Sequence, residues 1–246
     1  MDPDVGSSAL LHALLRDNRV EMIELLLDFG ADAAVYSTRY RLSGFQLAAR
    51  CGRGDLLEML EQRGIMLQFG PVDRVIAACA RGDRAAAQKL VAAQSGLREE
   101  LAADGGKLLS VFSGNGNLEG VRCLLELGLR PDSLYGPIGD GYWDLTPVSM
   151  PLHVAAWRGW PGVVKELIAR GPVNALDGKG RTALMLAIRA CVDSYWMERR
   201  TPEAVADLLA AGATLDGVKV PCGYEEVDAL IRQYRGEAGV EEGGLS

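Results

Sequence analysis

The stretch from Met150 to Gly171 reads M-P-L-H-V-A-A-W-R-G-W-P-G-V-V-K-E-L-I-A-R-G and predicts two short antiparallel helices. Gly159 separates the two apolar runs. Pro161 suits the first turn of the second helix, because a proline there costs no hydrogen bond. We expect Gly171 to end this helix, since glycine adopts the left-handed C-cap without a steric penalty. Such a pair cannot bury both of its apolar faces alone, so it requires neighbouring pairs.

These residues resemble the ankyrin repeat, whose pattern runs from threonine-proline-leucine-histidine to a closing glycine. Met150 stands where the family has threonine, and Glu166 places a charge in the usual leucine run. The matching residues are Pro151, Leu152, His153, Ala155, Ala156, Gly159, Val163, Val164, Leu167 and Gly171. The resemblance implies an all-α solenoid of stacked helix-turn-helix repeats with β-turn fingers between them.

The same pattern recurs along the 246 residues, and we interpret the chain as a single ankyrin repeat domain of about six repeats. The predicted repeats lie near residues 9–34, 43–64, 73–94, 107–128, 150–171 and 182–212, with a C-terminal capping helix at 223–235. The third repeat is the most degenerate, because Ala86 and Ala87 replace its valine pair. In the fourth, Phe112 takes a position where the family prefers alanine, which predicts a wider helix spacing. The first repeat should have a polar outer face.

Two insertions interrupt the repeats, at residues 130–149 and 190–200. In the first, Asp140-Gly141 predicts a type I′ turn at the tip of an elongated finger, because both central residues of that turn need positive φ. In the second, helical spacing predicts that the inner helix of the sixth repeat continues for about two extra turns. The residues with this spacing are Ile188, Val192, Tyr195 and Arg199.

Composition and net charge argue against several classes of protein. The formal net charge of −7 argues against general affinity for nucleic acid or anionic membranes. Five cysteines without a Cys-x-x-Cys pair indicate reduced thiols rather than a disulfide framework. The sequence shows neither a leader segment nor an apolar run of membrane-spanning length. These features predict a soluble cytoplasmic protein.

Catalytic and metal-binding signatures are incomplete. Gly105-Gly106-Lys107 lacks the earlier glycine of a P-loop and is followed by leucine. The two histidines, His12 and His153, both take the structural histidine position of the repeat, where we expect hydrogen bonds to the backbone of the same and the next turn. We therefore expect no metal, no cofactor and no catalytic residues, and consider an enzyme the minor hypothesis.

The positions just after the alanine pair face the concave groove where ankyrin-like proteins usually bind partners. Arginine occupies this region in five of the six repeats, as Arg16, Arg50, Arg81, Arg158 and Arg189. A guanidinium group suits carboxylate or phosphate recognition, because its planar fork donates two parallel hydrogen bonds. The alternative is that these arginines simply sit in solvent, as charged residues mostly do.

All four tryptophans lie near the fifth and sixth repeats, as Trp143, Trp157, Trp160 and Trp196, with Tyr142 and Tyr195 beside them. We predict Trp157 on the groove, and Tyr142, Trp143 and Asp144 on the finger that bends over it. Trp160 and Trp196 should pack against each other. For Trp143 and Trp157 core packing is the alternative, because large rings serve both as core fillers and as interface anchors.

Three hypotheses follow. The first is a monomeric protein-protein interaction module, which holds a partner with an acidic or mixed-polarity surface through its groove and finger tips. The second is a small-molecule binding protein or unusual enzyme, with a closed pocket of several hundred Å³ between the finger 137–144 and repeats five and six. The third is a self-assembling scaffold. Fold alone does not name a partner.

Overall fold

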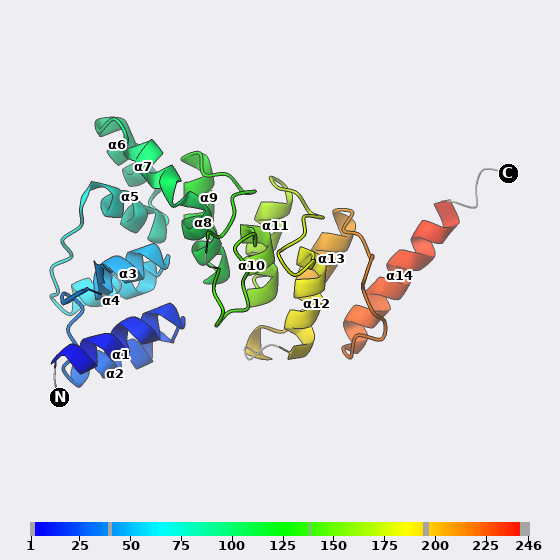
Figure 1. Cartoon of the computed structure of the whole chain (residues 1–246), viewed down its shortest axis with the longest axis horizontal. Coiled ribbons are helices and arrows are strands. Elements are labelled where there is room, and N and C mark those ends of the chain that lie inside the picture. Colours follow the sequence, from blue (N-terminus) through cyan, green and yellow to red (C-terminus); the bar gives the residue numbers. More distant parts are fainter. Residues whose placement is uncertain (1–2, 39–40, 138, 194–196, 242–246) are drawn as a thin grey trace. The chain divides into compact units, whose positions relative to one another are not determined.

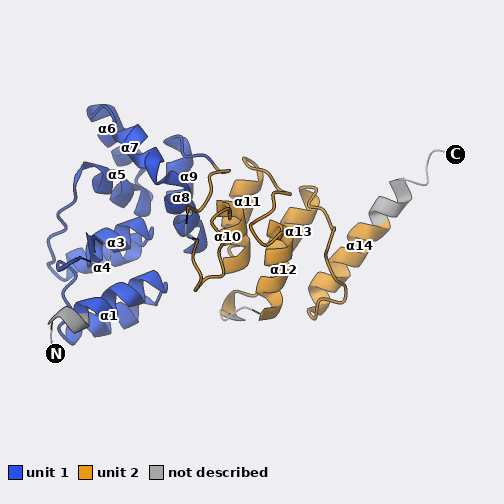
Figure 2. Ribbon diagram, in the orientation of Figure 1, with its two compact units in different colours: residues 1–130 blue, residues 131–246 orange. Residues whose placement is uncertain are grey.

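The computed structural model describes residues 3–38, 41–137, 139–193 and 197–241. In this part of the chain the regular structure is helical, apart from one short two-stranded ribbon and one isolated bridge (Figure 1). The prediction of an all-α repeat fold is therefore confirmed in class. The chain divides into two compact units, unit 1 with residues 1–130 and unit 2 with residues 131–246 (Figure 2). Unit 2 begins within the predicted insertion 130–149.

Unit 1 consists of helices paired through short turns. The pairs are α1 (Pro3–Leu15) with α2 (Val20–Asp28), α3 (Gly44–Arg50) with α4 (Gly54–Gln62), α5 (Pro71–Ala80) with α6 (Arg84–Ala93), and α8 (Gly105–Gly114) with α9 (Leu118–Glu126). A further helix, α7 (Leu97–Ala103), occupies the linker before α8. The antiparallel strands β1 (Tyr36–Ser37) and β2 (Leu42–Ser43) form the finger expected before the second repeat.

Local hydrogen bonds explain where the repeat helices of unit 1 start and stop. The Ser43 hydroxyl accepts the Gln46 N–H, while the Gln46 side-chain oxygen accepts the Ser43 N–H at 2.9 Å, so the two residues form a capping box that starts α3. Predicted left-handed glycines have positive φ, with values of 90° at Gly30, 78° at Gly64 and 101° at Gly128. In the third repeat Gly96 takes this role instead of Gln94, with φ of 86°.

The first repeat departs from its prediction at both helices. Helix α1 begins at Pro3, six residues before the predicted boundary. On α2 and at its C-cap residue Phe29 an apolar stripe is exposed, with exposed fractions of 46% for Met22, 48% for Leu25 and 64% for Phe29. The prediction of a polar outer face for the first repeat is therefore wrong. Only Ile23 of α2 turns fully into the core, and the other apolar side chains stay at least partly exposed.

Stacking in unit 1 is irregular around Phe112. Helix α5 packs on α3 and on α9, and α8 packs directly on α3, so the fourth repeat reaches the second. The Phe112 ring is fully buried against Gly52, where an added Cβ would lie 2.8 Å from the ring. The Asn117 amide joins three repeats, since it donates to the carbonyls of Gly52 at 2.6 Å and Ala80 at 2.7 Å.

Unit 2 stacks more regularly. Its elements are α10 (Pro151–Arg158), α11 (Pro161–Ile168), α12 (Ala183–Asp193), the 3-10 turn η1 (Met197–Arg199), α13 (Glu203–Ala210) and α14 (Glu225–Glu241). Helix α10 packs on α12, and α11 packs on α13, so first helix meets first helix and second meets second. The predicted capping helix is α14, which covers α13 with the fully buried Val227 and Ile231.

Three predictions for unit 2 need correction. Gly171 is not left-handed, because α11 ends earlier, with right-handed backbone at Ala169 and with the N–H groups of Arg170 and Gly171 both donating to Leu167. Helix α12 is described as far as Asp193, and residues 197–199 form a 3-10 turn instead of the predicted α-helix; residues 194–196 of the predicted extension lie outside the described residues. Helix α14 continues to Glu241, beyond the predicted end of the capping helix at residue 235.

Candidate partner-binding site

The insertion that opens unit 2 forms a finger whose tip, residues 140–145, is closed by its own backbone. Asp140 and Leu145 exchange two N–H to carbonyl hydrogen bonds, at 2.9 and 2.8 Å. One carboxylate oxygen of Asp140 also accepts the N–H groups of Tyr142 and Trp143, at 3.1 and 3.3 Å. A side chain at position 139 would meet the Leu145 carbonyl at 2.4 Å, so this position requires glycine. The tip is therefore ordered mainly by one aspartate.

The predicted type I′ turn at Asp140-Gly141 is wrong. Neither residue has positive φ, whereas Gly139 has 70° and Asp144 has 58°. The bridge between Asp140 and Leu145 leaves a four-residue loop, which the Asp140 carboxylate stabilises by capping two of its amides. Ile138, in the predicted finger, lies outside the described residues.

Asp144 ties the finger to the rest of unit 2. Its carboxylate accepts hydrogen bonds from Arg181 and Arg189, each at 2.6 Å, and from Lys179. Arg181 also donates to the Asp144 carbonyl at 2.9 Å and to the buried Asp177 carboxylate at 2.6 Å. Partial burial raises the pKa of Asp144, but the hydrogen bonds from the three cations outweigh it and hold that pKa well below its usual range. Asp144 therefore joins the finger to the next linker and to α12.

Aromatic rings and guanidinium groups alternate beneath the finger. The Trp157 indole N–H donates to the Trp143 carbonyl at 2.9 Å. The Arg158 guanidinium carbon lies 3.7 Å from the Trp143 ring centre, and that of Arg189 lies 4.5 Å from the Trp157 ring centre. Both distances fall within the range of cation–π attraction. Two side chains of α10 and one of α12 thus support the finger.

Trp157 and Arg158 are not available on an open groove. Their exposed fractions are 6% and 3%, so the prediction that both face a partner from the groove surface is wrong. The reason is the finger itself, which covers them with the Trp143 ring and carbonyl. Core packing, the alternative raised for these aromatics, describes Trp157.

Tyr142 is the exposed member of the cluster. Its exposed fraction is 57%, and its ring meets the Trp143 ring edge-on, with centroids 4.6 Å apart. Lys179 and Arg189 flank Asp144 with side chains 54% and 39% exposed. The surface of the finger thus presents an aromatic ring on an ordered loop beside two partly exposed cations.

The remaining predicted site residues belong to unit 1 and have partners of their own. Arg50 donates to Asp73 at 2.8 Å, and Arg81 pairs with Glu61 at 2.8 Å. Arg16 is half-buried. Structure thus brings together six of the predicted residues, namely Tyr142, Trp143, Asp144, Trp157, Arg158 and Arg189. The guanidinium groups of Arg50, Arg81 and Arg189 were predicted to bind a partner. Each is already paired with a carboxylate of the same chain.

Sequence reasoning missed Lys179, Arg181 and Asp177 as parts of this cluster. They lie at residues 173–182, in the linker between the fifth and sixth repeats, where the sequence pattern predicted no site residue. Asp177 accepts the backbone N–H groups of Lys179 and Arg181, both at 2.9 Å, which turns the side chains at 179 and 181 toward Asp144. The spacing Asp-Gly-Lys-Gly-Arg was a usable signal, because an aspartate two residues before an N–H favours such a turn.

Residues 150–178 match the family model of the ankyrin repeat. This segment is an ankyrin repeat. It comprises α10, α11 and the start of the linker that holds Asp177, so the suspected family is confirmed on these residues. No curated protein matches the sequence.

His153 has the structural role expected within the ankyrin repeat. Its Nδ1 accepts the Met150 N–H at 3.0 Å, and its Nε2 donates to the Ala175 carbonyl at 2.9 Å. Burial lowers the pKa of His153, so its ring is neutral and this tautomer matches both contacts. His153 therefore joins the repeat to its following linker. His12, at the same position of the first repeat, is exposed instead, so the expected backbone role is not seen there.

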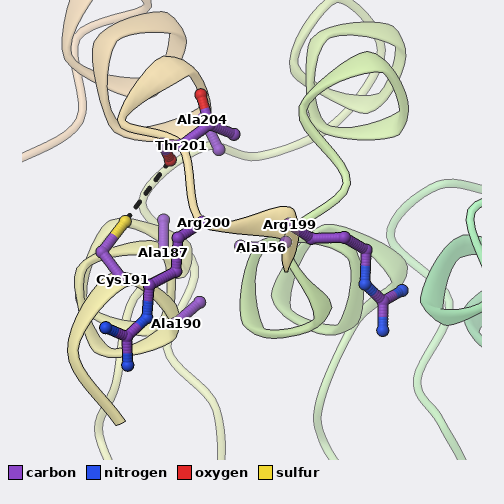
Figure 3. A pocket seen from close by; sticks show the side chains of 9 residues that line it. Ala156, Ala187, Ala190, Cys191, Arg199, Arg200, Thr201 and Ala204 are labelled. Atoms are coloured by element: carbon purple, nitrogen blue, oxygen red, sulfur yellow. Dashed lines mark hydrogen bonds between the residues drawn. The ribbon is translucent and has the colours of Figure 1, made fainter. Parts of the chain in front are cut away.

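A small pocket lies between α10 of the ankyrin repeat, α12 and η1 (Figure 3). Its volume is about 10 Å³, room for about one water molecule. It is lined by small side chains such as Ala156 and Ala187, together with Arg199 and Arg200. Arg199 also lies over the Trp160 ring, at 4.3 Å, so the turn of the fifth repeat does meet the insertion of the sixth. Trp196 and Tyr195 lie outside the described residues.

This pocket does not support the small-molecule hypothesis, which required several hundred Å³ between the finger and Trp157. Between the finger and α10, the Trp143 ring lies directly on the Arg158 guanidinium group. Within the described ranges, no group of three or more His, Cys, Asp or Glu side chains could hold a metal ion. Among the described helices, none combines the length and the apolar character needed to cross a membrane.

Proposed function

We propose that this protein is a protein-protein interaction module whose partner docks on the finger tip at residues 140–144. Ankyrin repeats generally mediate protein-protein interaction. The observation that carries the proposal is Tyr142, an aromatic side chain 57% exposed on a loop that internal hydrogen bonds hold in place. An ordered loop with an exposed aromatic ring loses little entropy on binding, which is the property of an interface anchor.

The charges beside Tyr142 favour a partner of mixed polarity. Asp144 offers two carboxylate oxygens to three cations, so Lys179 and Arg189 keep donor groups that Asp144 does not use. A partner with an apolar recess for the tyrosine ring and a carboxylate beside it would match this surface. We propose further that the helix pairs form one solenoid domain of about six repeats and a cap, and that the protein is a cytoplasmic monomer.

The test compares two exposed tyrosines on two fingers. Tyr142 and Tyr36 have exposed fractions of 57% and 56%, and Tyr36 belongs to the β1–β2 finger of unit 1. A photo-crosslinking residue at each position identifies proteins captured from native cytosol by mass spectrometry. The captured partner is then purified, and its affinity is measured by calorimetry for Tyr142→Ala, Tyr36→Ala and the unchanged chain.

We expect Tyr142→Ala to weaken binding about thirty-fold, the size of a hot-spot loss of about 2 kcal/mol. Thermal stability should be unchanged within about 0.5 kcal/mol, because an exposed side chain is removed. Tyr36→Ala should bind as the unchanged chain does. Equal affinity of Tyr142→Ala and the unchanged chain would refute the finger as the docking site.

A further inference from the structure

Two cysteines of unit 1 meet inside the contact between the third and fourth repeats. Cys79 lies on α5 and Cys123 on α9, and their Sγ atoms are 3.0 Å apart. Their exposed fractions are 0% and 1%, and both are free thiols. They are 44 positions apart in the sequence, so only the packing of α5 on α9 brings them together.

The hydrogen bond between the two thiols shifts their pKa values in opposite directions. The hydrogen bond to Cys123, together with burial, raises the pKa of the Cys79 thiol, and the hydrogen bond from Cys79 lowers the pKa of Cys123. Cys123 is therefore the thiol that ionises first and acts as the nucleophile, since the thiolate is the reactive form. Cys79 lies next to it as the resolving thiol.

The surroundings allow the short movement that a bond requires. A disulfide needs the sulfur atoms about 2.05 Å apart, so the thiols must approach by roughly 1 Å. Helix α6, which packs on α5, turns only two small side chains fully into the core, Ala87 and Val91. We expect a helix with so little buried apolar surface to open more easily than one with large core residues.

We propose that Cys79 and Cys123 form a reversible intramolecular disulfide by exchange with a small-molecule disulfide such as oxidised glutathione. The Cys123 thiolate attacks one sulfur of the small disulfide, and one thiolate leaves and takes up a proton. Cys79 then loses its proton and attacks the Cys123 sulfur, which releases the second small thiol. Two protein thiols are oxidised while one small disulfide is reduced to two thiols. The product joins the third and fourth repeats covalently.

The experiment incubates the purified full chain with oxidised glutathione and follows it by mass spectrometry. We expect the loss of two hydrogen atoms, a peptide that links residues 79 and 123, and reversal by dithiothreitol. The melting temperature should rise by about 5–10 °C, because the bond closes a loop of some 45 residues in the unfolded chain. Exchange should be slow, since both thiols are buried and react only when the contact opens.

Cys79→Ala and Cys123→Ala should each abolish the linked peptide and the rise in melting temperature. Cys191→Ala is the matched control, because Cys191 is also buried, at 3% exposed, but its Sγ contacts the Thr201 carbonyl. It should keep both effects. Stable mixed disulfides with glutathione, links to other cysteines or unreacted thiols in the unchanged chain would each overturn the proposal, and this result does not depend on whether the alanine variants fold.

Discussion

The two units carry side chains of different size at the same position of the repeat. The difference is seen where α10 meets α12 in unit 2 and where α3 meets α8 in unit 1. In unit 2, Ala155 and Ala187 take the small-residue position of their repeats, and both are fully buried. Their repeats stack first helix on first helix. In unit 1, Phe112 takes that position, and its ring reaches past the third repeat to Gly52 in the turn of the second.

The difference shows what an alanine at this position does. A small side chain lets the neighbouring helix approach closely, which keeps each repeat in contact with the next one alone. A phenyl ring is too large for such a close approach of two helices. Two glycines make room for the Phe112 ring, since a Cβ at Gly52 or at Gly120 would lie within 2.8 Å of it. Unit 2 instead places its large rings at the end of α10 and on the finger, where they leave the stack regular.

Removal of the ring at the centre of unit 1 should have the largest effect on stability. Phe112→Ala deletes a fully buried phenyl ring and should cost about 3–5 kcal/mol of unfolding free energy. Urea denaturation measures the loss, and hydrogen exchange should locate it in α3 and α8. Phe29→Ala, which removes a ring 64% exposed, is the control and should cost little. A small loss for Phe112→Ala would show that the ring does not hold these repeats together.

The corresponding change in unit 2 is Trp157→Ala. It removes a buried ring and the hydrogen bond to the Trp143 carbonyl, and should cost about 3 kcal/mol. Hydrogen exchange should rise in the finger and in α10 while α3 and α8 stay protected. Trp157→Phe keeps a ring and should lose less. An unchanged melting temperature for Trp157→Ala would restore the original expectation that this residue lies on an open groove.

A double-mutant cycle sharpens the comparison in unit 1. Gly52→Ala should cost about 2 kcal/mol, because φ of 69° strains an alanine and the new methyl group meets the Phe112 ring. In the Phe112→Ala background only the strain of about 1 kcal/mol should remain. Denaturation of the four proteins gives the coupling energy. Strict additivity would mean that the ring and the glycine do not meet.

The smallest expected effect concerns the charge that holds the finger. Asp144→Asn should cost about 1 kcal/mol at pH 7, a modest value because the carboxylate is partly exposed. Its pKa is lowered in the folded protein, so its contribution is present above the unfolded pKa of about 3.9 and is lost as pH falls further. The stability difference between the two proteins should therefore shrink progressively as pH falls below about 4. Asp193→Asn, with a side chain 62% exposed, is the control.

Much of the repeat pattern was predictable because it depends on local chemistry. Turn glycines, proline at a helix start and apolar spacing act within a few residues, so the helix pairs appear near the predicted positions, and the buried His153 makes its two backbone contacts. The gathering of aromatic and arginine residues near the fifth and sixth repeats also followed from spacing alone. The helix boundary was less predictable in the first repeat, since α1 begins at Pro3, six residues before the predicted repeat.

The sequence by itself determined which residues form helices, since propensity, capping and periodicity are properties of short segments. Only the tertiary structure decided which side chains are covered. Trp157 and Arg158 sit at positions that an open groove would expose, and the finger buries them because Asp144 is held by cations 35 to 45 positions away. Likewise, Cys79 and Cys123 meet only because α5 packs on α9. Such contacts depend on the folded path of the whole unit, which no local pattern records.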